Sequence, residues 1–170
     1  MSNEEIVAEF EKKYDELDVN KKDKIGRDEF FKLYKQLQKK DDIPKSNSDI
    51  IFSGIDFNNE GTISKFDFIN FVKSEIYCDE LNQYKIIFRS FDKDRNGALT
   101  TDSVIEIGKF VNKKITKKEA ETILENETGS KNGKMTFPVF YKMMTGRDTD
   151  PKTDPYDGRL KSSSLCCLLL

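Results

Sequence analysis

The sequence predicts an all-α protein built from four copies of one helix–loop–helix unit, arranged in two lobes. Two observations lead to this prediction. A polar stretch of about twelve residues lies between apolar residues at helical spacing, and the whole pattern is repeated along the chain. The eighth residue of each stretch is apolar and is expected to pair neighbouring loops through a short two-stranded contact. The four stretches begin at Asp18, Asp56, Asp92 and Thr128, and their eighth residues are Ile25, Ile63, Leu99 and Met135.

Helix boundaries are indicated by capping signals, in which a hydroxyl residue is followed three positions later by an acidic one. These pairs are Ser2 with Glu5, Ser46 with Asp49, Ser64 with Asp67 and Thr116 with Glu119. The joint from Ile76 to Glu80 contains neither glycine nor proline, so both a continuous and a hinged helix stay open there.

Composition narrows the function classes. The chain has 170 residues, of which 36% are hydrophobic and 35% charged, and its net charge is only -2. Compact cores are therefore expected, and a nucleic-acid partner is not. The absence of histidine excludes His-based acid–base catalysis and His-ligated zinc, and we find no catalytic constellation, so we predict no enzyme. The three cysteines have neither disulfide-framework nor zinc spacing, which favours a reducing compartment.

The second polar stretch, from Asp56 to Asp67, has the best set of oxygen donors. Its candidate ligands are the side chains of Asp56, Asn58, Glu60, Ser64 and Asp67 and the backbone carbonyl of Thr62. Gly61 at the sixth position permits a sharp turn. A hard cation such as Ca²⁺ takes about six to eight oxygens, which such a loop can supply. The last position of a twelve-residue calcium-binding loop usually carries Glu, and Asp67 is one methylene shorter. We therefore expect weaker Ca²⁺ binding and competition from Mg²⁺.

The other three stretches are less complete. The third offers Asp92, Asp94, Asn96 and Thr100 but ends on Ser103 where a bidentate carboxylate belongs, so weak binding and no binding both stay open. The first has Lys22 at a ligand position and Asp23 in place of the turn glycine. The fourth, from Thr128, has no carboxylate among its ligand positions. We expect the first and fourth to fold without holding metal.

Residues 1 to about 146 resemble the calmodulin and troponin C superfamily of four-EF-hand proteins. The closest stretch runs from Phe88 to Thr100. The resemblance implies calcium sensing or buffering and the binding of an amphipathic target helix. We predict an N-terminal EF-hand pair over residues 1–78, a C-terminal pair over 79–146 and a flexible tail over 147–170.

The chain ends on Cys167-Leu168-Leu169-Leu170, which fits the C-a-a-X box for prenylation. Leucine at the last position favours geranylgeranyl transfer to Cys167. One lipid chain binds membranes reversibly, so Cys166 is a candidate for palmitoylation as a second anchor. An unmodified apolar C-terminus is the alternative.

The main hypothesis is a calcium-binding sensor or adaptor, tethered by its lipid to the cytoplasmic face of a membrane and accompanied by a cytosolic pool. Its partners would be an amphipathic helix of a target protein and the membrane. The alternatives are a metal-independent, light-chain-like scaffold that clamps a target helix, and a calcium buffer.

Overall fold

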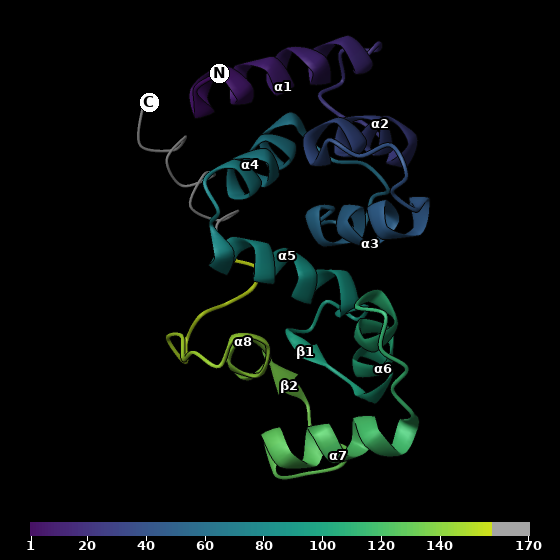
Figure 1. Cartoon of the computed structure of the whole chain (residues 1–170), viewed down its shortest axis with the longest axis vertical. Helices are drawn as coiled ribbons and strands as arrows, with labels where there is room; N and C mark the ends of the chain where they lie inside the picture. Colours follow the sequence, from purple (N-terminus) through teal and green to yellow (C-terminus); the bar gives the residue numbers. More distant parts are fainter. Residues whose placement is uncertain (158–170) are drawn as a thin grey trace. The chain divides into compact units, whose positions relative to one another are not determined.

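The computed structural model describes residues 1–157, which form α-helices and one short two-stranded sheet (Figure 1). The chain divides into two compact units, Met1–Ser90 and Phe91–Leu170, which we describe separately. The expected division after residue 78 stays a prediction. Among the helices of the described residues, none is both long enough and apolar enough to cross a bilayer.

The first unit contains two helix–loop–helix units. Its helices are α1 (Asn3–Leu17), α2 (Arg27–Gln38), α3 (Lys45–Ile55), α4 (Lys65–Ile76) and α5 (Glu80–Phe91) up to Ser90. The first loop connects α1 to α2, and the second connects α3 to α4. Ile25 and Ile63 exchange both backbone hydrogen bonds, at N···O distances of 3.0 and 2.9 Å, and so join the two loops in an antiparallel bridge. The loop pairing expected from the sequence is confirmed here.

Aromatic rings form the core of the first unit. Phe30 on α2 is fully buried, and its ring centroid lies 5.6 Å from that of Phe52 and 6.3 Å from that of Phe68. These residues come from α2, α3 and α4, so the two helix–loop–helix units share one core. Burying each ring contributes about 1.5–3 kcal/mol relative to leaving it exposed.

Most helices of the first unit begin where the sequence indicates. Ser2 Oγ accepts from the Glu5 N–H at 3.2 Å, and the Glu5 carboxylate accepts from the Ser2 N–H at 2.7 Å, which completes a capping box. The expected cap at Ser46 is wrong, because α3 already begins at Lys45, directly after Pro44. Pro44, whose ring fixes its backbone angle, occupies the N-cap position, so α3 begins without a side-chain cap.

The joint between α4 and α5 is hinged. Helix α4 ends at Ile76, and Cys78 adopts a left-handed backbone conformation (φ 52°) before α5 begins. Helix α5 packs so closely on α3 that a side chain on Gly54 would collide with the carbonyl of Ile86. Arg89 Nε donates to the Gly54 carbonyl at 2.6 Å, which satisfies an acceptor at the end of α3.

The second unit repeats the arrangement with its own two-stranded sheet. Its elements are β1 (Ala98–Leu99), α6 (Thr101–Phe110), α7 (Lys117–Thr128), β2 (Met135–Thr136) and α8 (Phe137–Thr145). Strands β1 and β2 are antiparallel, with Leu99 opposite Met135 (Figure 1). Both residues are fully buried, together with Leu124 and Phe140. The all-α fold with four EF-hand units and short loop pairings is therefore confirmed.

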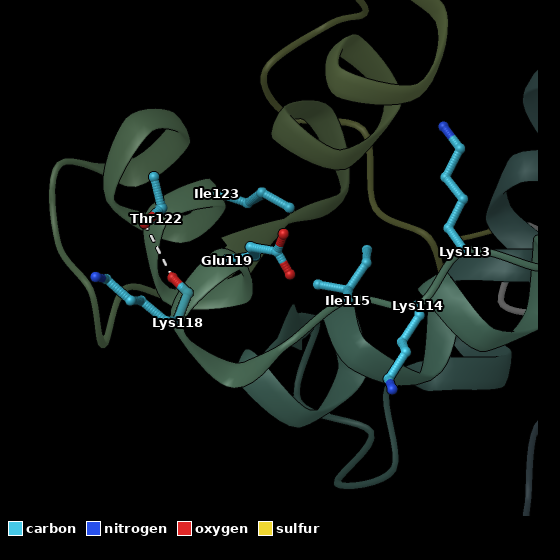
Figure 2. Close-up of a pocket in the computed structure, with 7 residues that line it drawn as sticks. All are labelled: Lys113, Lys114, Ile115, Lys118, Glu119, Thr122 and Ile123. Atoms are coloured by element: carbon cyan, nitrogen blue, oxygen red, sulfur yellow. Dashed lines mark hydrogen bonds between the residues drawn. The ribbon is translucent and has the colours of Figure 1, made fainter.

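A groove lies on the second unit at the connection between α6 and α7. Its volume is about 680 Å³, and its lining residues are Lys113, Lys114, Ile115, Lys118, Glu119, Thr122 and Ile123 (Figure 2). Figure 2 shows the three lysine side chains extending outward around Ile115 and Glu119. The groove thus combines an apolar floor with a largely basic rim.

Candidate calcium-binding loops

The second loop is organised around Asp56, which follows the last residue of α3 and is only 3% exposed. One carboxylate oxygen of Asp56 accepts from the Glu60 N–H at 3.1 Å, and the other accepts from the Gly61 N–H at 2.9 Å. Gly61 adopts φ 74°, a left-handed conformation that costs glycine little. The chain is therefore already turned around Asp56.

Asp67 lies at the other end of this loop, in the first turn of α4, and is 7% exposed. Ser64 Oγ donates to one Asp67 carboxylate oxygen at 2.8 Å and accepts from the Asp67 N–H at 3.1 Å. The expected helix cap at Ser64 is thus confirmed. Two carboxylates are buried at opposite ends of a single loop, and burial of such charges requires hydrogen-bond donors or a cation nearby.

Glu60, a predicted ligand, is bound by one residue of the first loop and one of its own loop. One of its carboxylate oxygens accepts from Lys24 Nζ at 2.6 Å, and the other accepts from Asn58 Nδ2 at 3.1 Å. Both partners of the Lys24–Glu60 pair are about half exposed, so this contact contributes only about 0–1 kcal/mol. A cation in the second loop would have to compete with this weak pair for Glu60.

The donor chemistry of the second loop fits a hard divalent cation. The two buried carboxylates, together with Asn58, Glu60, Ser64 and the Thr62 carbonyl, form an all-oxygen set. Within residues 1–157, however, no three His, Cys, Asp or Glu side chains lie in a preformed metal-binding cluster. The individual ligands therefore stay predictions, and binding requires the acidic side chains to converge.

The third loop starts in the same way. Asp92 is 1% exposed, and its carboxylate oxygens accept from the Asn96 N–H at 3.3 Å and the Gly97 N–H at 2.8 Å. The hydroxyl of Tyr156 also donates to Asp92, at 2.8 Å. Asp94 and Thr100, two further predicted ligands, are exposed on this loop.

The end of the third loop differs, because Ser103 occupies the last ligand position. Its hydroxyl donates to the carbonyl of Phe91 at 2.9 Å, and it caps α6 together with Thr100. Ser103 therefore serves the protein's own backbone and supplies no charge to a cation. The third loop has one buried carboxylate where the second has two.

The first loop also folds around its first carboxylate. Asp18 accepts from the N–H groups of Lys22 and Asp23, at 3.2 and 2.7 Å. Asp23 adopts φ 55°, so a non-glycine residue carries the left-handed turn. Such a conformation costs roughly 1–2 kcal/mol.

The fourth loop is folded differently from the other three. Helix α7 continues to Thr128, whose hydroxyl donates to the Leu124 carbonyl at 2.6 Å, and Gly129 ends the helix at φ 78°. A side chain on Gly133 would collide with Thr128. Thr128 is thus turned towards its own helix. That the first and fourth loops hold no metal stays a prediction.

Tyr14 connects α1 to the paired loops. It is fully buried, and its hydroxyl donates to the Ile63 carbonyl at 2.8 Å. Burial, followed by the negative charges of Asp23 and Asp18, raises the pKa of Tyr14 well above its ordinary value. The phenol therefore stays protonated and keeps its hydrogen bond over the physiological pH range.

Tyr156 is the residue that the sequence analysis missed. The sequence favours an exposed tether after the last helix, whereas Pro155 is buried and Tyr156 contacts Asp92. The signal for local order was present: Asp-Pro occurs twice, at Asp150 and Asp154, and this pair favours tight turns. The predicted lipid sites, Cys166 and Cys167, lie outside the described residues.

Comparison with known proteins agrees with the loop geometry. Residues 21–75 match a family described as an EF-hand domain pair. Troponin C isoform 2A from Homarus americanus is 23% identical over 148 residues, which cover 85% of this chain and 97% of that protein. Troponin C isoform 1 from Balanus nubilus is 27% identical over 150 residues, covering 86% and 93%. A putative calmodulin-like protein 6 from Oryza sativa subsp. japonica is 22% identical over 148 residues, covering 84% and 85%.

These similarities extend over most of the chain, and the EF-hand match spans the second loop completely. They support Ca²⁺ as the cofactor expected from the sequence. Together with the fold, they show that the chain is similar to EF-hand proteins of the calmodulin and troponin C type.

Proposed function

We propose that this protein is a calcium sensor or adaptor, which holds Ca²⁺ in its second loop and binds an amphipathic helix of a target protein. The observation that carries the proposal is the burial of Asp56 and Asp67 at opposite ends of a loop whose backbone is already turned. A divalent cation would neutralise both carboxylates, and the fixed turn lowers the conformational cost of binding it.

A cation would be sensed through the position of α4. Asp67 lies in the first turn of α4, and the next residue, Phe68, is fully buried in the aromatic core. If Asp67 moves towards a bound ion, Phe68 has to move with it, because both residues belong to the same helical turn. Calcium binding would thereby bias the packing of the first unit between two arrangements.

The groove of the second unit suits an amphipathic target helix. Ile115 and Ile123 would contact the apolar face of such a helix, and Lys113, Lys114 and Lys118 would contact acidic residues beside that face. An acidic flank on the target is therefore part of the proposal. Because the net charge of the chain is -2, we propose no nucleic-acid partner, and we propose an adaptor that is not itself an enzyme.

The membrane tether rests on the C-terminal sequence. Geranylgeranylation of Cys167, with palmitoylation of Cys166, would hold the adaptor at the cytoplasmic face of a membrane and leave a cytosolic pool. Intact-mass analysis after expression in eukaryotic cells tests the tether. We expect an added geranylgeranyl mass that Cys167→Ser abolishes, and an unmodified C-terminus in the wild type would reject it.

A metal-independent scaffold is the second candidate, and a calcium buffer is a third. The scaffold is favoured by the Lys24–Glu60 pair and by the position of Thr128, which show loops stabilised by the protein's own contacts. Binding of the target helix that is unchanged by chelator would favour the scaffold. Calcium binding without any structural change would favour the buffer.

Calorimetric titration of CaCl₂ into the full-length protein, at physiological Mg²⁺, tests the calcium site. We expect saturable binding that Asp56→Ala weakens at least roughly tenfold, because a charged ligand is lost. Asp18→Ala is the matched control, since Asp18 has the same position and backbone contacts in the first loop. Equal binding by the wild type and Asp56→Ala would contradict the proposed site.

A further inference from the structure

The described part of the tail contains two consecutive tight turns of the same type. In the first, the Asp150 side chain accepts from the Lys152 N–H at 2.9 Å, and the Asp150 carbonyl accepts from the Thr153 N–H at 2.8 Å. In the second, the Asp154 side chain accepts from the Tyr156 N–H at 2.8 Å. Proline follows each aspartate and fixes the backbone angle that such a turn requires.

These turns hold Tyr156 against the third loop. Pro155 is buried, and the Tyr156 hydroxyl donates to the same Asp92 oxygen that accepts from the Gly97 N–H. Lys142 on α8 forms an ion pair with Asp148 at 2.8 Å, near the start of the tail. The segment from Asp148 to Tyr156 is thus attached to the second unit at both ends.

We infer that the tail and Ca²⁺ compete for the third loop, with Tyr156 as the competing group at Asp92. This inference rests on one part of the proposed function, namely that the protein binds calcium. It adds an internal regulator that acts on a different loop from the proposed sensor site.

The competition follows from the charge on Asp92. Its carboxylate is almost fully buried, so its negative charge depends on the donors that surround it. A hydroxyl that points its proton at this carboxylate supplies some of the positive potential that a cation would supply. A bound cation would place positive charge beside the same proton, and this repulsion would turn Tyr156 away.

The third loop is well suited to this competition because it offers a cation few negative charges. Ser103 supplies no carboxylate at its last position, so the loop offers a cation less than the second loop does. The free energy of one charge-assisted hydrogen bond would then be comparable to the free energy by which this loop binds a cation. By thermodynamic linkage, the tail weakens calcium binding by the same factor by which calcium weakens docking of the tail.

Release of the tail would also affect the proposed membrane tether. Cys166 and Cys167 follow Tyr156 in the sequence, so undocking residues 148–156 lengthens the connection between a lipid on Cys167 and the second unit. Calcium at the third loop would then change how far the second unit reaches from the membrane surface.

The test is a CaCl₂ titration of the full-length protein followed by NMR, with the Gly97 amide resonance as the reporter of the third loop. We expect Tyr156→Phe to raise the calcium affinity at Gly97 about tenfold, the effect of removing one hydrogen bond to a charged group. Asp154→Ala, which removes a side-chain bond of the second turn, should change the affinity in the same direction. Tyr77→Phe is the matched control, because its hydroxyl also donates to a carboxylate, that of Glu4, in the first unit.

A second readout follows the tail itself. Hydrogen exchange of the Tyr156 and Asp157 amides should accelerate when calcium saturates the third loop, because their turn contacts are lost. Protection that persists at saturation would overturn the inference. An affinity at Gly97 that Tyr156→Phe leaves unchanged or lowers would also overturn it, and so would a Gly97 resonance unaffected by calcium in this variant. The Gly61 resonance reports the second loop independently, so failure of the proposed sensor site is seen separately.

Discussion

The second and third loops begin alike and end differently. In each, a buried aspartate accepts from the backbone N–H of a glycine five residues later, at 2.9 Å in the second loop and 2.8 Å in the third. The second loop then ends on the buried carboxylate of Asp67, whereas the third ends on Ser103, whose hydroxyl donates to a backbone carbonyl. The first half of an EF-hand loop thus sets the backbone turn, and its last residue decides how much charge the loop offers to a cation.

The largest expected effect concerns how each loop is attached to its core. Phe68, one residue after the second loop, is fully buried, whereas the smaller Val104 has the equivalent position after the third. We expect Phe68→Ala to lower the free energy of unfolding by about 3–5 kcal/mol, as for other buried aromatic residues. Urea denaturation measures the change.

Phe66→Ala is the control for this experiment, because Phe66 lies in the same turn of α4 but is 48% exposed. It should change stability by no more than about 0.5 kcal/mol. If Phe68→Ala cost as little as Phe66→Ala, the second loop would not be anchored in the aromatic core.

The next largest effect is expected when the last residues of the two loops are exchanged. Asp67→Ser gives the second loop the ending of the third, and we expect its calcium affinity to fall roughly 10- to 100-fold, because one charged ligand is lost while the Ser64 cap persists. Calorimetry measures the loss.

Ser103→Asp is the reciprocal change and should strengthen calcium binding at the third loop, although it also removes the hydrogen bond to the Phe91 carbonyl. Unchanged affinities in both variants would show that the last residue does not distinguish the loops.

The smallest effect concerns the ion pair that holds Glu60. Lys24→Ala should raise the calcium affinity of the second loop a few-fold, since Glu60 no longer has to leave a lysine, and should change stability by less than about 1 kcal/mol. Lys93→Ala is the matched control, because Lys93 forms an exposed pair of the same length, 2.6 Å, with Glu106 beside the third loop. A weaker second site in Lys24→Ala would mean that Lys24 helps to position Glu60 for the cation.

The sequence predicts the features that depend on local pattern. The pairing of Ile25 with Ile63 and of Leu99 with Met135 follows from a repeat in which each eighth residue is apolar. The turn at Gly61 follows from the short-range preference of glycine for left-handed angles.

Contacts between side chains that the repeat pattern does not relate are absent from the sequence prediction. The contact between Lys24 and Glu60 joins two loops, and nothing near Glu60 in the sequence indicates it. Tyr156 and Asp92 lie still further apart along the chain. The Asp-Pro pairs predict turns in the tail, but the face of the molecule on which those turns lie depends on tertiary packing.

The central claim is that two loops with the same beginning bind calcium unequally because of their ends. A CaCl₂ titration of the wild-type protein, followed by NMR at the Gly61 and Gly97 amides, tests it most directly, because both N–H groups donate to the first carboxylate of their loop. We predict that Gly61 responds and saturates at a calcium concentration at least roughly tenfold lower than Gly97. Saturation of both amides at the same concentration, or of Gly97 first, would contradict the account.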